Sequence, residues 1–161
     1  LISNDQLDVV FTEGLVSERD HDGAEVVAHD RLVPIAHPKH PIFHQKRITA
    51  ASLCRQGLIF REIGSGTREV IEDALIRRGL AVKPIMSLGS TEAIKRAVQA
   101  GMGLAIVSEL TIDAELAARA LRVVPATDLV IRRPLKLSRP RAKSDSPTAI
   151  EFLRLLRAAL H

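Results

Sequence analysis

The sequence predicts an α/β fold in which helices cover a largely parallel β-sheet. Strand-like and helix-like segments alternate through the middle of the chain, as they do in parallel sheets. The interior has to be aliphatic, because 46% of the 161 residues are hydrophobic but only four are Phe and none is Trp or Tyr. Aliphatic cores are typical of sheets covered by helices. A chain of this length can bury a real core, as one domain or as two small lobes.

The first third of the chain is expected to hold strands and loops. The β-rich run Leu7–Thr12 predicts a buried strand, and the polar stretch after it, through Gly23, predicts an exposed loop. Two further strands are expected at Glu25–His29 and Arg31–His37, before Pro38 ends regular structure.

The middle of the chain changes to helical periodicity. A short helix is expected at Ile48–Arg55, and a longer one at Thr67–Arg78, where apolar residues recur on one face and Gly79 can end the helix. Ser90 can cap a further amphipathic helix that ends at Gly101. Short strands are expected between these helices, at Gly57–Arg61, Pro84–Leu88 and Leu104–Val107.

The C-terminal third repeats the alternation. A short helix is expected at Thr111–Ala120, strands at Leu121–Val124 and Leu129–Leu137, and a loop at Arg139–Asp145. Ser146 and Pro147 then begin a terminal helix as N-cap and first helical residue. Its inward-facing residues are expected to be Leu153, Leu156 and Leu160.

Two glycine–hydroxyl segments indicate ligand binding. In Phe60–Arg68 a strand runs through Gly64, Ser65, Gly66 and Thr67 into a helix start, where exposed N–H groups favour a small anion. Leu88–Thr91 repeats the arrangement, with Ser90 and Thr91 ahead of the next helix. Both helix starts should converge on a crevice at the carboxyl edge of the sheet. Taken alone, the Gly64–Thr67 segment is more typical of an ordinary helix cap, and it is the convergence of the two segments that makes ligand binding an equal alternative.

The same segments do not indicate a nucleotide site or an enzyme. They lack the Gly-Lys-Ser/Thr ending of a Walker loop and the spacing of a dinucleotide fingerprint. Ser65 and Ser108 have no evident histidine base, and no Gly-x-Ser-x-Gly elbow is present. The acidic residues near the first segment, Glu62, Glu69, Glu72 and Asp73, are better explained by a solvated helix face. We therefore expect no catalytic residues and no cofactor.

Metal binding is not expected either. His37, His40 and His44 lie within eight residues but lack a metal-ligand spacing, which favours a solvated loop. The single cysteine, Cys54, is interpreted as a buried thiol rather than a nucleophile and weakly favours a reducing cytoplasm. No run of 18 apolar residues that could span a membrane occurs.

The net charge of +4 permits nucleic-acid binding but does not require it. Much of the excess comes from Arg132, Arg133, Lys136, Arg139, Arg141 and Lys143. We interpret this cluster as a solvated strand edge and loop, with a phosphate-binding strip as the alternative. Aromatic platforms for stacking bases are scarce in this sequence.

Two long motifs resemble the effector-binding domain of LysR-type transcriptional regulators. They are Arg61–Arg68, with the letters REIGSGTR, and Gly89–Ser108, with the letters GSTEAIKRAVQAGMGLAIVS. Weaker support comes from Leu7–Val10, from Ala36-His37-Pro38 with His40-Pro41, and from the terminal helix at Ala149–Leu156. The resemblance extends over nearly the whole chain.

The resemblance implies a type II periplasmic-binding-protein-like fold, with two Rossmann-like lobes joined by two crossover strands. Residues 1–33 and 131–161 would form lobe I, and 34–130 would form lobe II. The winged helix-turn-helix, the linker helix and the first strand–helix–strand of lobe I would precede Leu1, so lobe I would be incomplete.

The resemblance also implies a function. A small inducer, expected to be an anion, would bind between the lobes and change how the DNA-bound oligomer packs, with DNA contacted only through the missing helix-turn-helix. The residues expected to line the site are Thr12, Ser65, Gly66, Thr67, Ser90, Thr91, Val107 and Ser108. The alternative is a solute-binding protein of a transport system, which shares this fold.

Overall fold

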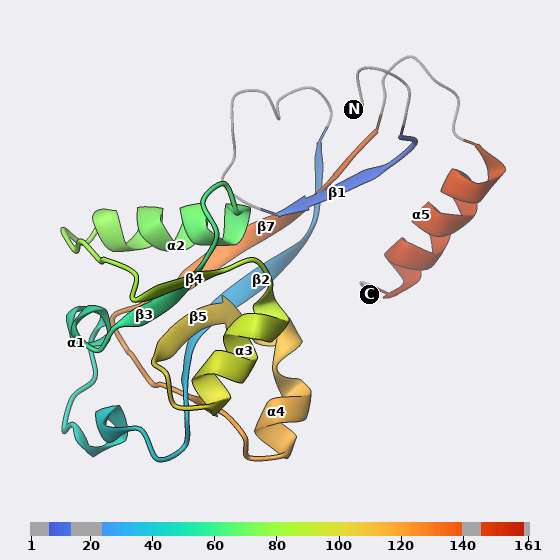
Figure 1. Cartoon of the computed structure of the whole chain (residues 1–161). Coiled ribbons are helices and arrows are strands. Elements are labelled where there is room, and N and C mark those ends of the chain that lie inside the picture. Colours follow the sequence, from blue (N-terminus) through green and yellow to red (C-terminus); the bar gives the residue numbers. More distant parts are fainter. Residues whose placement is uncertain (1–6, 14–23, 140–145, 160–161) are drawn as a thin grey trace. The chain divides into compact units, whose positions relative to one another are not determined.

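The structure is a computed structural model that describes residues 7–13, 24–139 and 146–159 (Figure 1). It divides into two compact units. Both ends of the chain form unit 1, which comprises Leu1–His29 and Arg133–His161, and the middle of the chain, Asp30–Arg132, forms unit 2. Strands β2 (Glu25–Ala36) and β7 (Ile131–Ser138) each have residues in both units.

Unit 2 is built on a mixed sheet. Strand β3 (Leu58–Arg61) is parallel to β4 (Met86–Leu88) on one side and to β5 (Leu104–Ser108) on the other. Strand β2 is antiparallel to β5 and also pairs with the short β6 (Arg122–Val123). The predicted parallel arrangement is therefore confirmed for three strands, whereas the pairings of β2 are antiparallel.

Helices cover both faces of this sheet. Even-numbered residues of β3 and β5, such as Phe60 and Ile106, pack with α1 (Ala50–Arg55) and α2 (Gly66–Ile76) in one core cluster. Odd-numbered residues, such as Ile59 and Ala105, pack with α3 (Thr91–Gln99) in a second cluster. Because strand side chains alternate between faces, α2 and α3 lie on opposite sides of the sheet.

Local signals in the sequence explain where these helices begin and end. Thr49 and Ser52 form a reciprocal capping box at the start of α1, and the Ala50 N–H also donates to Asp128 Oδ1 at 2.8 Å. At the end of α2, Gly79 has a φ of +69°, and its N–H donates to the Ile76 carbonyl at 2.8 Å. The positive φ accounts for glycine at this position.

The described part of unit 1 contains two strands and one helix besides the start of β2. Strand β1 (Val10–Glu13) is antiparallel to β7, with Thr12 opposite Lys136. Helix α5 (Pro147–Ala159) begins as predicted, because the Ser146 hydroxyl accepts the Ala149 N–H at 3.2 Å. Leu153 is buried and Leu156 half-buried, while Leu160 lies outside the described residues.

The structure differs from the predicted elements most clearly in three places. Strand β1 starts three residues later than predicted, and three of its four residues are exposed rather than buried. The two strands predicted before Pro38 are one continuous strand, β2, because Asp30 keeps the extended backbone. The helix predicted at Thr111–Ala120 is instead a 3-10 turn, η4 (Glu109–Thr111), followed by the short α4 (Asp113–Ala117).

Two predicted loops fall largely outside the described residues. The polar stretch through Gly23 lies mostly in the 14–23 gap, and the Arg139–Asp145 loop lies mostly in the 140–145 gap.

Candidate functional site

The starts of α2 and α3 lie at one edge of the unit 2 sheet. Helix α2 follows β3 and helix α3 follows β4, and these two strands are parallel. Both helices therefore begin at the carboxyl edge of the sheet, on opposite faces. In open α/β sheets a crevice at this edge is where ligands bind.

The start of α2 presents backbone donors and a hydroxyl. Gly64 has a φ of +87° and turns the chain between β3 and the helix. Ser65 is the N-cap residue, yet its half-buried side chain makes no capping hydrogen bond. Its carbonyl accepts the Glu69 N–H at 3.0 Å, which closes the first turn. The N–H groups of the first turn carry the positive end of the helix dipole.

Gly66 and Thr67 are the first two residues of α2, and they differ in what they can offer a ligand. Gly66 has no side chain and contributes only its backbone. The Thr67 side chain belongs to a residue that is only 7% exposed, and it already has an interaction within the protein.

The start of α3 is a conventional cap. The exposed Ser90 accepts the Ala93 N–H through its hydroxyl at 3.1 Å, as predicted, and Thr91 is half-buried beside it. Glu92 in the first turn complements the helix dipole. The two helix starts therefore use their serines differently, because only the Ser90 hydroxyl is engaged in capping.

Arg68 fixes the start of α2 to the sheet, a role that the sequence did not indicate. Its guanidinium pairs with Glu72 at 2.7 Å and donates to the Arg61 carbonyl at 3.2 Å and the Ser87 hydroxyl at 3.4 Å. It also lies 5.6 Å from the centre of the Phe60 ring. The spacing of Arg68 and Glu72 by four residues was the available signal for the ion pair.

The end of β5 contributes a buried hydrogen bond. Ser108 is 7% exposed, and its hydroxyl donates to Asp30 Oδ1 at 2.9 Å, a partner that sequence reasoning missed. The Thr111 hydroxyl donates to the Ser108 carbonyl at 2.8 Å. Val107 is only 2% exposed, its side chain packs in the second core cluster, and it pairs with Val33 in the ladder between β5 and β2.

The predicted site residues are divided between the two units. Seven of them belong to unit 2: Ser65, Gly66, Thr67, Ser90, Thr91, Val107 and Ser108. Thr12 is exposed on β1 and belongs to unit 1.

A buried lysine links α3 to the segment after β5. Lys95 Nζ is 2.7 Å from Glu92, 2.8 Å from Glu115 and 2.7 Å from the Thr111 carbonyl, which uses all three of its donors. Burial opposes the charge of Lys95, but the hydrogen bonds to the two carboxylates outweigh it and raise its pKa. The hydrogen bond from Lys95 lowers the pKa of Glu115 against the opposing effect of burial.

The histidine segment has local structural roles. His37 Nδ1 accepts the Lys39 N–H and His40 Nδ1 accepts the Ile42 N–H, both at 3.1 Å. Burial and the neighbouring His37 lower the pKa of His40. Within the described ranges, no group of three or more His, Cys, Asp or Glu side chains is placed to hold a metal ion.

The interpretation of the basic cluster as a solvated edge was wrong for two of its members. Arg133 is 4% exposed and pairs with Glu13 at 2.7 Å, and Lys136 is 5% exposed. Both lie on β7, where pairing with β1 places them inside unit 1. Arg132 and Arg139 are exposed as predicted, while Arg141 and Lys143 lie outside the described residues.

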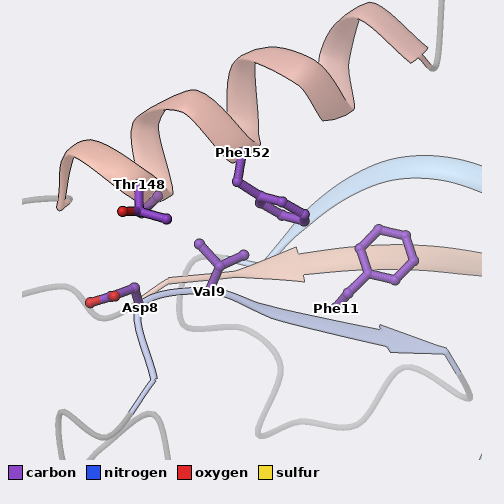
Figure 2. A pocket seen from close by; sticks show the side chains of 6 residues that line it. Asp8, Val9, Phe11, Thr148 and Phe152 are labelled. Atoms are coloured by element: carbon purple, nitrogen blue, oxygen red, sulfur yellow. The ribbon is translucent and has the colours of Figure 1, made fainter.

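Unit 1 has an open groove of about 360 Å³ between α5 and the β1 segment (Figure 2). Figure 2 shows Phe152 of α5 extending toward Phe11 of β1 and Val9 just before it, with Asp8 and Thr148 at one end. Ala149 completes the lining. None of the predicted site residues lines this groove, and the two helix starts of unit 2 have the better chemistry for an anion.

No helix in the described part of the chain is both long and apolar enough to span a bilayer.

Most comparisons with known proteins lead to one family. A family model described as the LysR substrate binding domain matches residues 1–161. A RuBisCO operon transcriptional regulator from Acidithiobacillus ferrooxidans is 34% identical over 152 residues, which are 94% of this chain and 49% of that protein. The HTH-type transcriptional regulator CbbR from Xanthobacter flavus is 43% identical over 117 residues, 71% of this chain and 35% of that protein. The chain thus spans half or less of the length of these curated relatives.

A solved structure supports the same assignment. The regulatory domain of CcmR from Synechocystis PCC6803, in complex with 2-PG, superimposes with a TM-score of 0.85 and 29% identity. The match covers 99% of this chain and 76% of that domain.

Proposed function

The chain belongs to the LysR substrate binding domain family, and from this premise we propose that it is the ligand-sensing part of a LysR-type transcriptional regulator. The predicted type II periplasmic-binding-protein-like α/β fold is confirmed by the likeness to the CcmR regulatory domain. Because the chain spans half or less of its curated relatives, control of transcription by the whole protein is part of the proposal.

The proposed ligand is a small anion held at the starts of α2 and α3. The observation that carries this proposal is the state of Ser65, an N-cap serine whose hydroxyl is not used for capping. Together with the first-turn N–H groups of α2, it offers donors to a phosphate, sulfate or carboxylate. Ser90 and Thr91 add a second helix start at the same sheet edge. The 2-PG in the Synechocystis domain supports an acidic ligand by analogy.

The remaining predicted residues complete the proposed site. Thr12 would contribute from lobe I, residues 1–33 and 131–161, and the others from lobe II, residues 34–130. Ligand binding would favour one arrangement of the lobes, and only a difference in affinity between two arrangements can have this effect. The regulator would transmit that change through its oligomer to DNA bound by a separate helix-turn-helix.

The other functions considered are less well supported. The family model is that of the LysR substrate binding domain, and the two relatives described above are named as transcriptional regulators, which does not favour a solute-binding protein of a transport system. We propose no enzymatic activity, because the hydroxyl of Ser108 donates to Asp30 and not to a histidine or lysine of the kind that activates a serine nucleophile. A cytoplasmic location is proposed from the same relatives.

Thermal unfolding of the chain with sulfate, phosphate, citrate and 2-PG tests this proposal. A ligand that binds the folded state raises the midpoint, by an amount that grows with concentration above Kd. We expect a selective increase for at least one anion. Ser65→Ala should raise the Kd of that ligand about fivefold, because one hydrogen bond worth about 1 kcal/mol is lost.

Ser146→Ala is the matched control, because Ser146 is an N-cap serine in unit 1 that does cap its helix. It should lower the midpoint without ligand and leave the ligand-induced increase unchanged. An unchanged midpoint with every anion, or equal ligand-induced increases in Ser65→Ala and the parent protein, would contradict the proposed site.

A further inference from the structure

The hydroxyl of Ser108 is oriented by a hydrogen bond to Asp30. Ser108 ends β5 opposite Leu32 of β2, and Asp30 lies two residues earlier on the same face of β2. The hydroxyl donates to Asp30 Oδ1 at 2.9 Å, and the two residues are 7% and 2% exposed. A serine hydroxyl has one hydrogen and two acceptor lone pairs, so its only hydrogen is already used.

The surroundings of Ser108 hold it in this role. Ser108 is also the N-cap residue of η4, but its hydroxyl makes no capping bond there. The Thr111 hydroxyl donates to the Ser108 carbonyl at 2.8 Å, which ties the residue to the following turn. Since the hydroxyl faces a buried carboxylate, rotating its hydrogen away would remove this hydrogen bond from Asp30, which is unfavourable.

We propose that Asp30 is a positioning residue that makes Ser108 an acceptor, so that the end of β5 selects ligands carrying a hydrogen-bond donor. The helix starts at Ser65 and Ser90 supply donors and favour an anionic group. The end of β5 supplies a lone pair next to a carboxylate, which disfavours a second anionic oxygen. The ligand class assigned by this polarity is a small acid that also carries a hydroxyl group. This inference rests on the proposed function, because it concerns the same site.

Matched pairs of acids test the inference. Malate and succinate differ by one hydroxyl, and 2-hydroxyethyl phosphate and propyl phosphate differ by a hydroxyl in place of a methyl. Calorimetric titration of the chain with each compound, and with each enantiomer of malate separately, gives five Kd values. We expect the hydroxylated member of at least one pair to bind about fivefold more tightly, as one net hydrogen bond predicts.

Variants distinguish the role of the hydrogen bond between Ser108 and Asp30 from a general loss of ligand binding. Ser108→Ala should bring the ratio of the two Kd values in the pair to about one, so that the hydroxylated acid is no longer preferred. Ser108→Thr keeps the hydroxyl and should keep the preference. Asp30→Asn should also reduce it, because an amide can donate to Ser108 and release the serine hydrogen. Arg31→Gln is the control: Arg31 is a neighbour of Asp30 whose exposed side chain pairs with Glu109 at 3.7 Å, and the preference should not change.

The outcomes distinguish this inference from the proposed function. If acids bind but hydroxylated members are not preferred, or the preference survives in Ser108→Ala, the inference is wrong and the proposed function stands. If no acid in either pair binds while an anion of the thermal-unfolding panel does, the inference is wrong and the proposed function stands; if neither set binds, both fail. A preference that is lost in Ser108→Ala and Asp30→Asn and kept in Arg31→Gln supports both.

Discussion

In the described part of the chain, three serines occupy the N-cap position of an α-helix, and their hydroxyls differ in whether they cap it. Ser90 and Ser146 accept a backbone N–H three residues ahead, at 3.1 and 3.2 Å, whereas Ser65 makes no such bond. A capping serine stabilises its helix by about 1 kcal/mol. A serine at a helix start that does not cap has no comparable contribution to stability, which is the physical reason to assign Ser65 to a ligand.

Stability measurements can separate these roles without any ligand. Ser90→Ala should lower the free energy of unfolding by about 1 kcal/mol, because the Ala93 N–H loses its acceptor. Ser65→Ala should change it by less than about 0.5 kcal/mol. Urea unfolding of the two variants beside the parent protein measures both values. An equal loss in the two variants would mean that Ser65 contributes to the fold after all.

At the scale of elements, the lysine of α3 holds the turn and helix that follow β5. Lys95 contacts Glu115 of α4, the Thr111 carbonyl of η4 and Glu92 of its own helix. Lys95→Met should therefore destabilise the protein by about 2 to 3 kcal/mol, since it leaves the largely buried Glu115 without its cation. Glu92 is 70% exposed, and Glu92→Gln should cost less than about 0.5 kcal/mol. Urea unfolding of both variants checks the contrast.

The same contacts predict a pH dependence. The pKa of Glu115 is lowered in the folded state, so its carboxylate stabilises the fold at pH values above the ordinary pKa of glutamate. This stabilisation is lost as the pH falls through the lowered pKa. The pKa of Lys95 is raised, so its ammonium group stabilises the fold at pH values below the ordinary pKa of lysine. This stabilisation is lost as the pH rises through the raised pKa. Lys95→Met should flatten the fall in stability on the acid side. An unchanged acid profile would contradict the role given to this pair.

Elements with a strong local signal could be predicted from the sequence. Helices α2, α3 and α5 combine periodic apolar residues with a Gly79, Ser90 or Ser146 boundary, and the structure has them within two residues of the predicted starts. The continuity of β2 through Asp30 could not be predicted, because a charged residue between two apolar runs is typical of a break. Its hydrogen bond comes from Ser108, which is 78 residues away.

Long-range contacts also limited the prediction of the candidate site. The two glycine–hydroxyl segments could be found, because each is local in sequence. Arg133 can be buried because it pairs with Glu13 of another strand. That partner could not be found from the sequence, so the charge of Arg133 predicted an exposed side chain. The roles of Asp30 and Arg68 likewise depend on partners brought close by the sheet.

At the scale of the whole molecule, the two units differ in how much core they bury. Both hydrophobic clusters found among the described residues lie within unit 2. In unit 1, three of the four residues of β1 are exposed, and α5 exposes Ile150, Phe152 and Leu155. Backbone hydrogen bonds with few buried apolar contacts around them open more readily. Unit 1 should therefore be the less stable part.

Hydrogen exchange tests this difference. Amides of β3 and β5 should exchange at least about tenfold more slowly than those of β1 and α5, which corresponds to about 1.4 kcal/mol of opening free energy. Mass spectrometry of peptides from the two units gives the comparison. Equal protection in both units would show that they unfold as one.

Amide-resolved NMR titration with inorganic phosphate and sulfate measures whether an anion binds at the two helix starts of unit 2. If it does, the amide signals of Gly66, Thr67, Thr91 and Glu92 move together and saturate with one Kd, and Ser65→Ala raises that Kd. If the moving signals instead belong to exposed basic residues such as Arg132 and Arg139, or no signal saturates, the site proposed here is wrong.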